Sequence, residues 1–188
     1  MYLFGYGSLI NLISAQKSFK RILTQNDLIS VKVKGYKRVW NAIESIQFQN
    51  ENSSVNGVFL NIQKDENSFI YGTVIEITNE EFEYLKLREK NYSCIQIDAK
   101  DVIDKQFEED LVAFMTIKEE KIAKIGDKKT YIPKRYINVL EDGLKNYNRD
   151  FIINFKTILQ DYPFDIKDGI YNFTDPIQNS ASGREREK

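Results

Sequence analysis

The first ten residues hold the residue types that point most directly to chemistry. Two glycines flank a tyrosine in Gly5-Tyr6-Gly7, directly after the apolar run Tyr2-Leu3-Phe4 and directly before Ser8. The apolar run is typical of a buried strand, and glycine adopts backbone conformations that other residues avoid. A tight turn of this kind directs several backbone N–H groups into one small volume. We therefore expect an anion or oxyanion site at this turn.

Composition restricts the groups that could transfer protons. The chain of 188 residues contains no histidine and a single cysteine, Cys94. Ser-His-Asp catalysis, Cys-His catalysis and histidine-ligated metal sites are therefore excluded. Acid–base work near neutral pH falls to a carboxylate with a raised pKa, or to Lys, Tyr or Cys. A metal could only be a hard cation bound by oxygens, and no acidic cluster has EF-hand spacing, so we expect no metal site.

Length and hydrophobic content favour one domain, and the single cysteine, which permits no internal disulfide, favours a cytoplasmic protein. The chain is 41% hydrophobic and has a formal net charge of −1, which suits a single core and argues against binding to nucleic acid or a membrane surface. No apolar run approaches the roughly 18 residues of a membrane span, and the N-terminus has no signal-peptide pattern. We expect one domain over residues 1–178 and a disordered tail over 179–188. The oligomeric state is left open.

Apolar periodicity predicts the elements that must position the opening turn. Helical spacing continues over residues 9–19, with Ser8 as a favoured N-cap. Cys94 falls within a predicted strand and is expected to be buried filler. We further expect strands over 28–40 (bent at Gly35), 55–62, 69–77, 92–97 and 111–117, helices over 78–89 and from Pro133 onward with a break near Asn148, and polar loops or turns over 46–54 and 64–67.

Three segments, in order along the chain, carry a family resemblance: FGYGSLI at 4–10, GYKRVW at 35–40 and LKLREKNYSCIQI at 85–97. They resemble the opening loop, a strand and the end of the central helix in the γ-glutamylcyclotransferase-like superfamily. The spelling of the first segment is closest to the ChaC branch. A looser match over 131–143 resembles a further family helix.

The resemblance implies an α+β fold, a small, closed or nearly closed mixed β-barrel with surrounding helices. It also implies a reaction in which the α-amine of a γ-glutamyl amine or peptide attacks its own γ-carbonyl and releases 5-oxoproline. The family's general acid/base falls on Glu89. The implied partner is a small γ-glutamyl substrate, with no cofactor. Glutathione, a γ-glutamyl dipeptide, a γ-glutamyl amine and an antibiotic intermediate all stay open.

The other site residues follow from the resemblance and from the needs of the reaction, which are oxyanion donors and a proton carrier around one substrate. We expect the substrate site to be lined by Tyr6, Gly7, Ser8, Leu9, Tyr92 and Tyr136.

Each assignment has a structural alternative. The Gly-x-Gly turn could be only a tight turn, and the Arg88-Glu89 pair could be an ordinary surface pair. Tyr6, Tyr92 and Tyr136 could be core residues. For the whole chain, the alternative to an enzyme is a non-catalytic module of the same fold that binds a small molecule or a protein.

Overall fold

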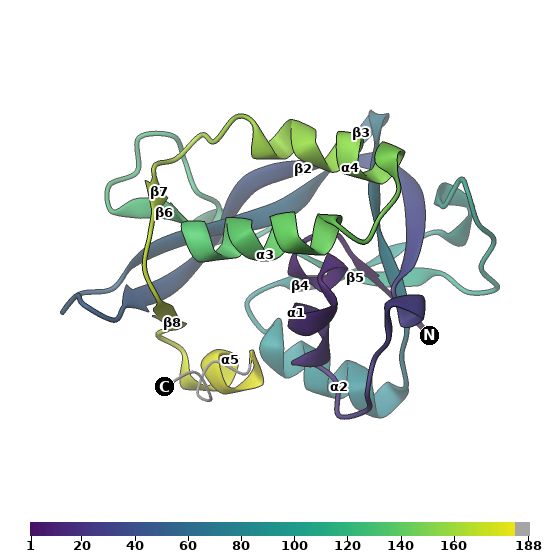
Figure 1. Cartoon of the computed structure of the whole chain (residues 1–188), viewed down its shortest axis with the longest axis horizontal. Coiled ribbons are helices and arrows are strands. Elements are labelled where there is room, and N and C mark those ends of the chain that lie inside the picture. Colours follow the sequence, from purple (N-terminus) through teal and green to yellow (C-terminus); the bar gives the residue numbers. More distant parts are fainter. Residues whose placement is uncertain (183–188) are drawn as a thin grey trace.

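The structure, a computed structural model, describes residues 1–182 (Figure 1). Its strands are β1 (Tyr2–Gly5), β2 (Ile29–Phe48), β3 (Val55–Glu76), β4 (Ser93–Ile97), β5 (Leu111–Met115), β6 (Thr130–Pro133), β7 (Ile166–Lys167) and β8 (Tyr171–Phe173). Its helices are α1 (Leu12–Gln16), α2 (Asn79–Arg88), α3 (Lys134–Leu144), α4 (Arg149–Lys156) and α5 (Pro176–Ala181). A short 3-10 helix, η1 (Ser8–Ile10), follows β1. In Figure 1, α3 and α4 lie over β2 and β3, and α2 and α5 lie together at the other end.

The sheet is mixed, and it stays open. Its strand order is β4-β5-β1-β3-β2-β8, with β6 added to β3 and β7 added to β6. β1 runs parallel to β5 and antiparallel to β3. The two ends of this order, β4 and β8, do not pair with each other within residues 1–182. The expected mixed fold of helices and strands is confirmed, and of the expected closed or nearly closed barrel the described residues do not form the closed one. The outermost strand β8 holds three residues and is followed by α5.

β2 and β3 are longer than the sequence pattern predicts. β2 continues to Phe48, so the loop expected over 46–54 begins later, because Ile46 pairs with both β3 and β8. The polar turn expected over 64–67 lies within β3. The β2–β3 pairing passes from Tyr36–Lys64 to Lys34–Phe69, so residues 65–68 bulge opposite Gly35 and the strand continues. Gly35 has φ +83°, which fits this bend.

The segment after β1 is less regular than a single helix over 9–19. Asn11 has an extended backbone and separates η1 from α1. Its Oδ1 accepts a hydrogen bond from Ser14 N at 3.0 Å and so caps α1. The expected N-cap role of Ser8 is therefore wrong, since the helix that needs the cap starts later.

Helices α2, α3 and α4 begin close to the positions that the sequence predicts. Thr78 and Glu81 form a capping box at the start of α2. Pro133 precedes α3, and the Asn148 side chain accepts from Phe151 N at 2.9 Å to start α4.

Cys94 is exposed, which corrects its expected burial. It lies on edge strand β4, whose pattern alternates, and faces away from the core.

Residues 179–181 of the expected tail lie in α5. Residues 183–188 lie outside the described part of the chain. Within residues 1–182, no helix is long and apolar enough to cross a membrane.

Asn61 joins β3 to the end of β5 through fully buried polar contacts. Its Nδ2 donates to Thr116 O at 2.9 Å, and its Oδ1 accepts from Thr116 N at 3.0 Å. Asn61→Ala leaves both Thr116 groups buried without partners, so we expect the free energy of unfolding to fall by about 2–3 kcal/mol. Urea unfolding measures this change, with Asn67→Ala at an exposed position of the same strand as the control. Equal stability of the two variants would contradict the expectation.

Candidate active site

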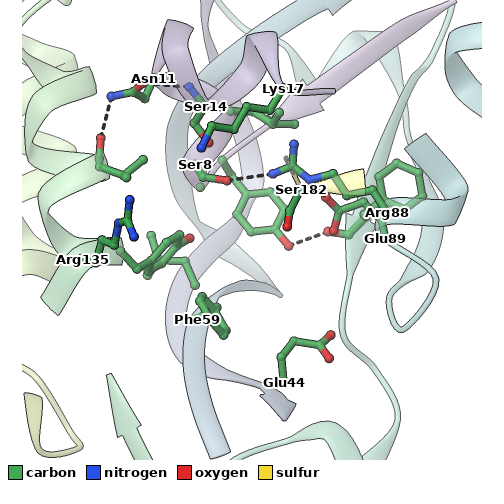
Figure 2. Close-up of a pocket in the computed structure, with 18 of the residues that line it drawn as sticks. Ser8, Asn11, Ser14, Lys17, Glu44, Phe59, Arg88, Glu89, Arg135 and Ser182 are labelled. Atoms are coloured by element: carbon green, nitrogen blue, oxygen red, sulfur yellow. Dashed lines mark hydrogen bonds and ion pairs between the residues drawn. The ribbon is translucent and has the colours of Figure 1, made fainter. Parts of the chain in front are cut away.

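One cavity of about 420 Å³ brings the predicted site residues together (Figure 2). Its lining includes every residue that the sequence analysis assigned to the site: Tyr6, Gly7, Ser8, Leu9, Glu89, Tyr92 and Tyr136. We call residues 5–9 the opening loop. The structure thus places this loop and Glu89 around one space, although they are far apart in the sequence. Their roles in a reaction remain predictions.

Buried hydrogen bonds from β2 and to β5 fix the opening loop. Arg38 is 8% exposed, and its Nε donates to Tyr6 O at 3.0 Å. The Tyr6 hydroxyl donates to Phe114 O at 2.5 Å. The Tyr6 hydroxyl thus uses its proton in a hydrogen bond to β5, and the Tyr6 ring forms part of the cavity wall. These contacts fix the loop backbone next to the cavity.

Glu89 is the C-cap of α2 and points into the same cavity. Its backbone N–H donates to Leu85 O, which completes the last turn of the helix. Arg88 Nε lies 3.1 Å from Glu89 Oε1, and the two side chains are only 12% and 18% exposed. The alternative of a surface pair is therefore wrong. Arg88 also contacts Ser18 and donates to Ser8 Oγ at 3.4 Å, so it connects Glu89 to the opening loop.

Burial sets the electrostatics of Glu89. Loss of solvent raises the pKa of this carboxyl above its ordinary value, the positive charge of Arg88 opposes that shift, and the carboxylate of Glu44 adds to it. The net direction is upward. A carboxyl group in this state both accepts and returns a proton more readily near neutral pH than an exposed glutamate does.

Three of the tyrosines that line the cavity, Tyr6, Tyr92 and Tyr136, stay neutral. Burial raises the pKa of Tyr6, Tyr92 and Tyr136, and the Glu89 carboxylate raises each of them further. Tyr136 also packs edge-on against Trp40 and Phe59, with ring centroids at 5.9 and 5.0 Å. Tyr136 is thus at once a core residue and a wall of the cavity.

Glu44 is a buried acidic residue of the cavity that the sequence analysis missed. It is 3% exposed, it accepts from Asn91 Nδ2 at 2.7 Å, and Lys121 Nζ lies 3.6 Å from it. Burial raises its pKa. The alternation of a strand could have identified it, because every second residue of β2, including Trp40, Ala42 and Glu44, faces the interior. The predicted strand ended at residue 40, so this pattern was not extended to Glu44.

No group of three or more Cys, Asp or Glu side chains within residues 1–182 is arranged to hold a metal ion. The cavity holds instead two buried carboxyl groups, neutral phenols and the backbone of the opening loop. This arrangement suits proton transfer to and from a small polar molecule.

The family model described as ChaC-like protein matches residues 1–174. The chain belongs to the ChaC-like family. No curated protein matches this ChaC-like chain.

Solved structures share the fold at low sequence identity. A structure titled γ-glutamyl cyclotransferase is 12% identical, with a TM-score of 0.61, over 100% of this chain and 99% of its own. YkqA from Bacillus subtilis is 21% identical, with a TM-score of 0.63, over 87% of this chain and 55% of its own. A γ-glutamyl cyclotransferase specific to glutathione from yeast is 14% identical, with a TM-score of 0.52, over 85% of this chain and 96% of its own. These likenesses show the γ-glutamylcyclotransferase-like fold.

Proposed function

We propose that this ChaC-like protein is a γ-glutamyl cyclotransferase that releases 5-oxoproline from a γ-glutamyl peptide or amine, with Glu89 as general acid/base. One observation carries the proposal: the buried Glu89 carboxyl and the backbone of the opening loop line the same cavity. Membership of the ChaC-like family supports the reaction class. The yeast structure, titled as specific to glutathione, makes glutathione the first substrate to test.

The cavity's main contribution is to hold the substrate folded. In the reaction, the α-amine nitrogen bonds to the γ-carbonyl carbon, and the bond from that carbon to the leaving nitrogen breaks. Because nucleophile and electrophile belong to one molecule, no protein nucleophile is needed. Attack within a correctly folded substrate has a very large effective concentration, about 10⁵ M or more.

Glu89 moves the protons that this exchange requires. As a carboxylate it accepts a proton from the α-ammonium group, which frees the lone pair that attacks. As a carboxylic acid it then gives this proton to the leaving nitrogen, which departs as an amine. The ring nitrogen loses its second proton through the same carboxylate to the released amine, so Glu89 ends the cycle ionised. A pKa raised by burial suits both halves of this cycle. The contact from Arg88 keeps the carboxylate form accessible.

The opening loop is the proposed site for the oxyanion. Negative charge develops on the γ-carbonyl oxygen when the α-amine attacks. Backbone N–H groups of Gly7, Ser8 and Leu9 lie at the start of η1, where no preceding helical carbonyl can accept from them. Fixed donors of this kind stabilise the transition state without reorganising.

A product assay tests the proposal. The protein is incubated with glutathione, γ-glutamyl-α-amino acids, γ-glutamyl-ε-lysine and a γ-glutamyl amine, with a chelator present, and the products are measured by mass spectrometry. At least one compound should give 5-oxoproline and one equivalent of amine. Tight binding of one compound without any product would favour a non-catalytic binding module instead.

The pH dependence of the best substrate should report the raised pKa of Glu89. Only the ionised carboxylate accepts the first proton, so kcat/KM should fall as the pH drops through the pKa of Glu89. Because burial raises that pKa, the fall should lie above the range of an ordinary glutamate, whose pKa is 4.5. Steady-state rates from pH 4 to 9 measure it. A flat profile down to the ordinary glutamate range would contradict this assignment.

A further inference from the structure

Helix α5 lies outside the segment that matches the family, which ends at residue 174, yet it contributes to the cavity. Gln178 is only 4% exposed and lines the cavity wall. Ser182, directly after the helix, lines the same cavity as Arg88 and Glu89 (Figure 2). α5 packs against α2, whose C-terminal end carries Glu89 (Figure 1).

Two side-chain pairs join α5 to the turn that follows Glu89. Lys90 forms an ion pair with Asp175, the residue that caps the N-terminus of α5. Asn91 Nδ2 lies 3.5 Å from Gln178 Oε1 and donates to Glu44 Oε2 at 2.7 Å. Both residues that follow Glu89 are therefore held by side chains of α5, of its N-cap or of β2.

We propose that α5 is a clamp on residues 89–92, in which Asp175 and Gln178 are positioning residues for Glu89. The clamp deepens the proposed function, because it assigns the groups that hold the proton carrier in place. Glu89 stands just beyond the last helical residue of α2, where helix ends fray. Misplacing a catalytic group by about 1 Å can cost about 10²-fold in rate, so this end of the helix needs a tether.

The clamp also keeps the Glu89 carboxyl away from water. The charged and titratable groups that face this carboxyl are Arg88 on α2, Tyr6 in the opening loop, Glu44 on β2, Tyr92 before β4 and Tyr136 on α3. None of them belongs to α5. Gln178 of α5 hydrogen-bonds Glu44, so loosening α5 should act on Glu89 through hydration and through Glu44, and both effects lower its pKa toward the ordinary value.

Variants of the Lys90–Asp175 pair separate positioning from simple charge effects. Asp175→Asn keeps a good N-cap for α5 but removes the ion pair. Lys90→Met removes the same pair from the other side. Both side chains are about one-third exposed (34% and 30%), so the loss of stability should be small. If only charge mattered, removing an acid and removing a base would shift the Glu89 pKa in opposite directions.

The experiment is a ¹³C NMR titration of the full chain labelled at glutamate carboxyl carbons, with the Glu89 signal assigned by its absence in Glu89→Gln. The clamp predicts that the pKa of Glu89 falls in Asp175→Asn, in Lys90→Met and in the uncharged change Gln178→Ala. Lys86→Met, which removes a lysine of α2 paired with Glu83, should leave it unchanged. Opposite shifts in the two pair variants, or no shift in either, would overturn the clamp.

Kinetics provide the second readout. In the clamp variants kcat should fall by about tenfold to 10²-fold with KM nearly unchanged, since Glu89 and not the binding surface is displaced. If the wild-type chain makes no 5-oxoproline, the proposed function fails, but the titration still decides the clamp. If the wild type is active and the variants keep its kcat and its titration, the clamp alone fails.

Discussion

Glu89→Gln is expected to lower turnover by about 10²–10⁴-fold while substrate binding largely survives. Glutamine keeps the size and hydrogen-bonding capacity of the side chain, but it can neither take the proton from the α-ammonium group nor return it to the leaving nitrogen. Steady-state formation of 5-oxoproline gives kcat, and calorimetric titration with substrate gives binding. Near-normal turnover in the variant would show that another group is the acid/base.

The fold should tolerate this change. Because burial raises the pKa of Glu89, the folded state favours the protonated form. The stability contributed by this protonated form is present at low pH and is lost as the pH rises through the raised pKa. Glutamine has no charge to bury, so the variant should be at least as stable as the wild type at pH 8. Glu83→Gln on the same helix, whose side chain is 68% exposed, is the matched control and should keep full activity.

Gly5→Ala is expected to lower kcat/KM by about 10²-fold through the opening loop. A Cβ at this position would lie 2.6 Å from Leu9 Cβ. Leu9 Cβ is bonded directly to the backbone and cannot rotate away, so the loop itself must shift. That shift moves the proposed oxyanion donors away from Glu89.

The same assay with thermal unfolding checks this expectation. The unfolding midpoint distinguishes a displaced loop from an unfolded chain. Comparison with the kinetic parameters of Glu89→Gln shows whether the two substitutions impair the same step. Full activity in Gly5→Ala would mean that the opening loop does not take part in the reaction.

Local patterns were sufficient to predict β1, the opening turn and the capped helix α2. Tyr2–Gly5 is apolar and ends at a glycine, and Thr78 with Glu81 marks the helix start unambiguously. These signals are encoded in neighbouring residues. The grouping of the opening loop with Glu89 came from the family resemblance and could not be obtained from periodicity.

Features set by distant contacts were missed. The polar residues 64–67 have turn-like composition, but pairing with β2 keeps them within β3. Glutamate is usually a surface residue, yet Glu44 is buried, and its partners Asn91 and Lys121 come from distant parts of the chain. Asn11, and not Ser8, caps α1 because its extended backbone interrupts the helical path. The contribution of α5 depends on contacts between residues 90–91 and 175–178, which no local pattern reveals.

The most direct test of cyclisation is to determine which atom replaces the leaving amine on the γ-carbonyl carbon. The best substrate is turned over in H₂¹⁸O beside an analogue in which hydrogen replaces the α-amine, and all products are weighed by mass spectrometry. Intramolecular attack predicts unlabelled 5-oxoproline with one equivalent of amine, and no cleavage of the analogue. Glutamate carrying ¹⁸O in its γ-carboxylate as the main product, or cleavage of the analogue at a comparable rate, would show attack by water and contradict the proposed reaction.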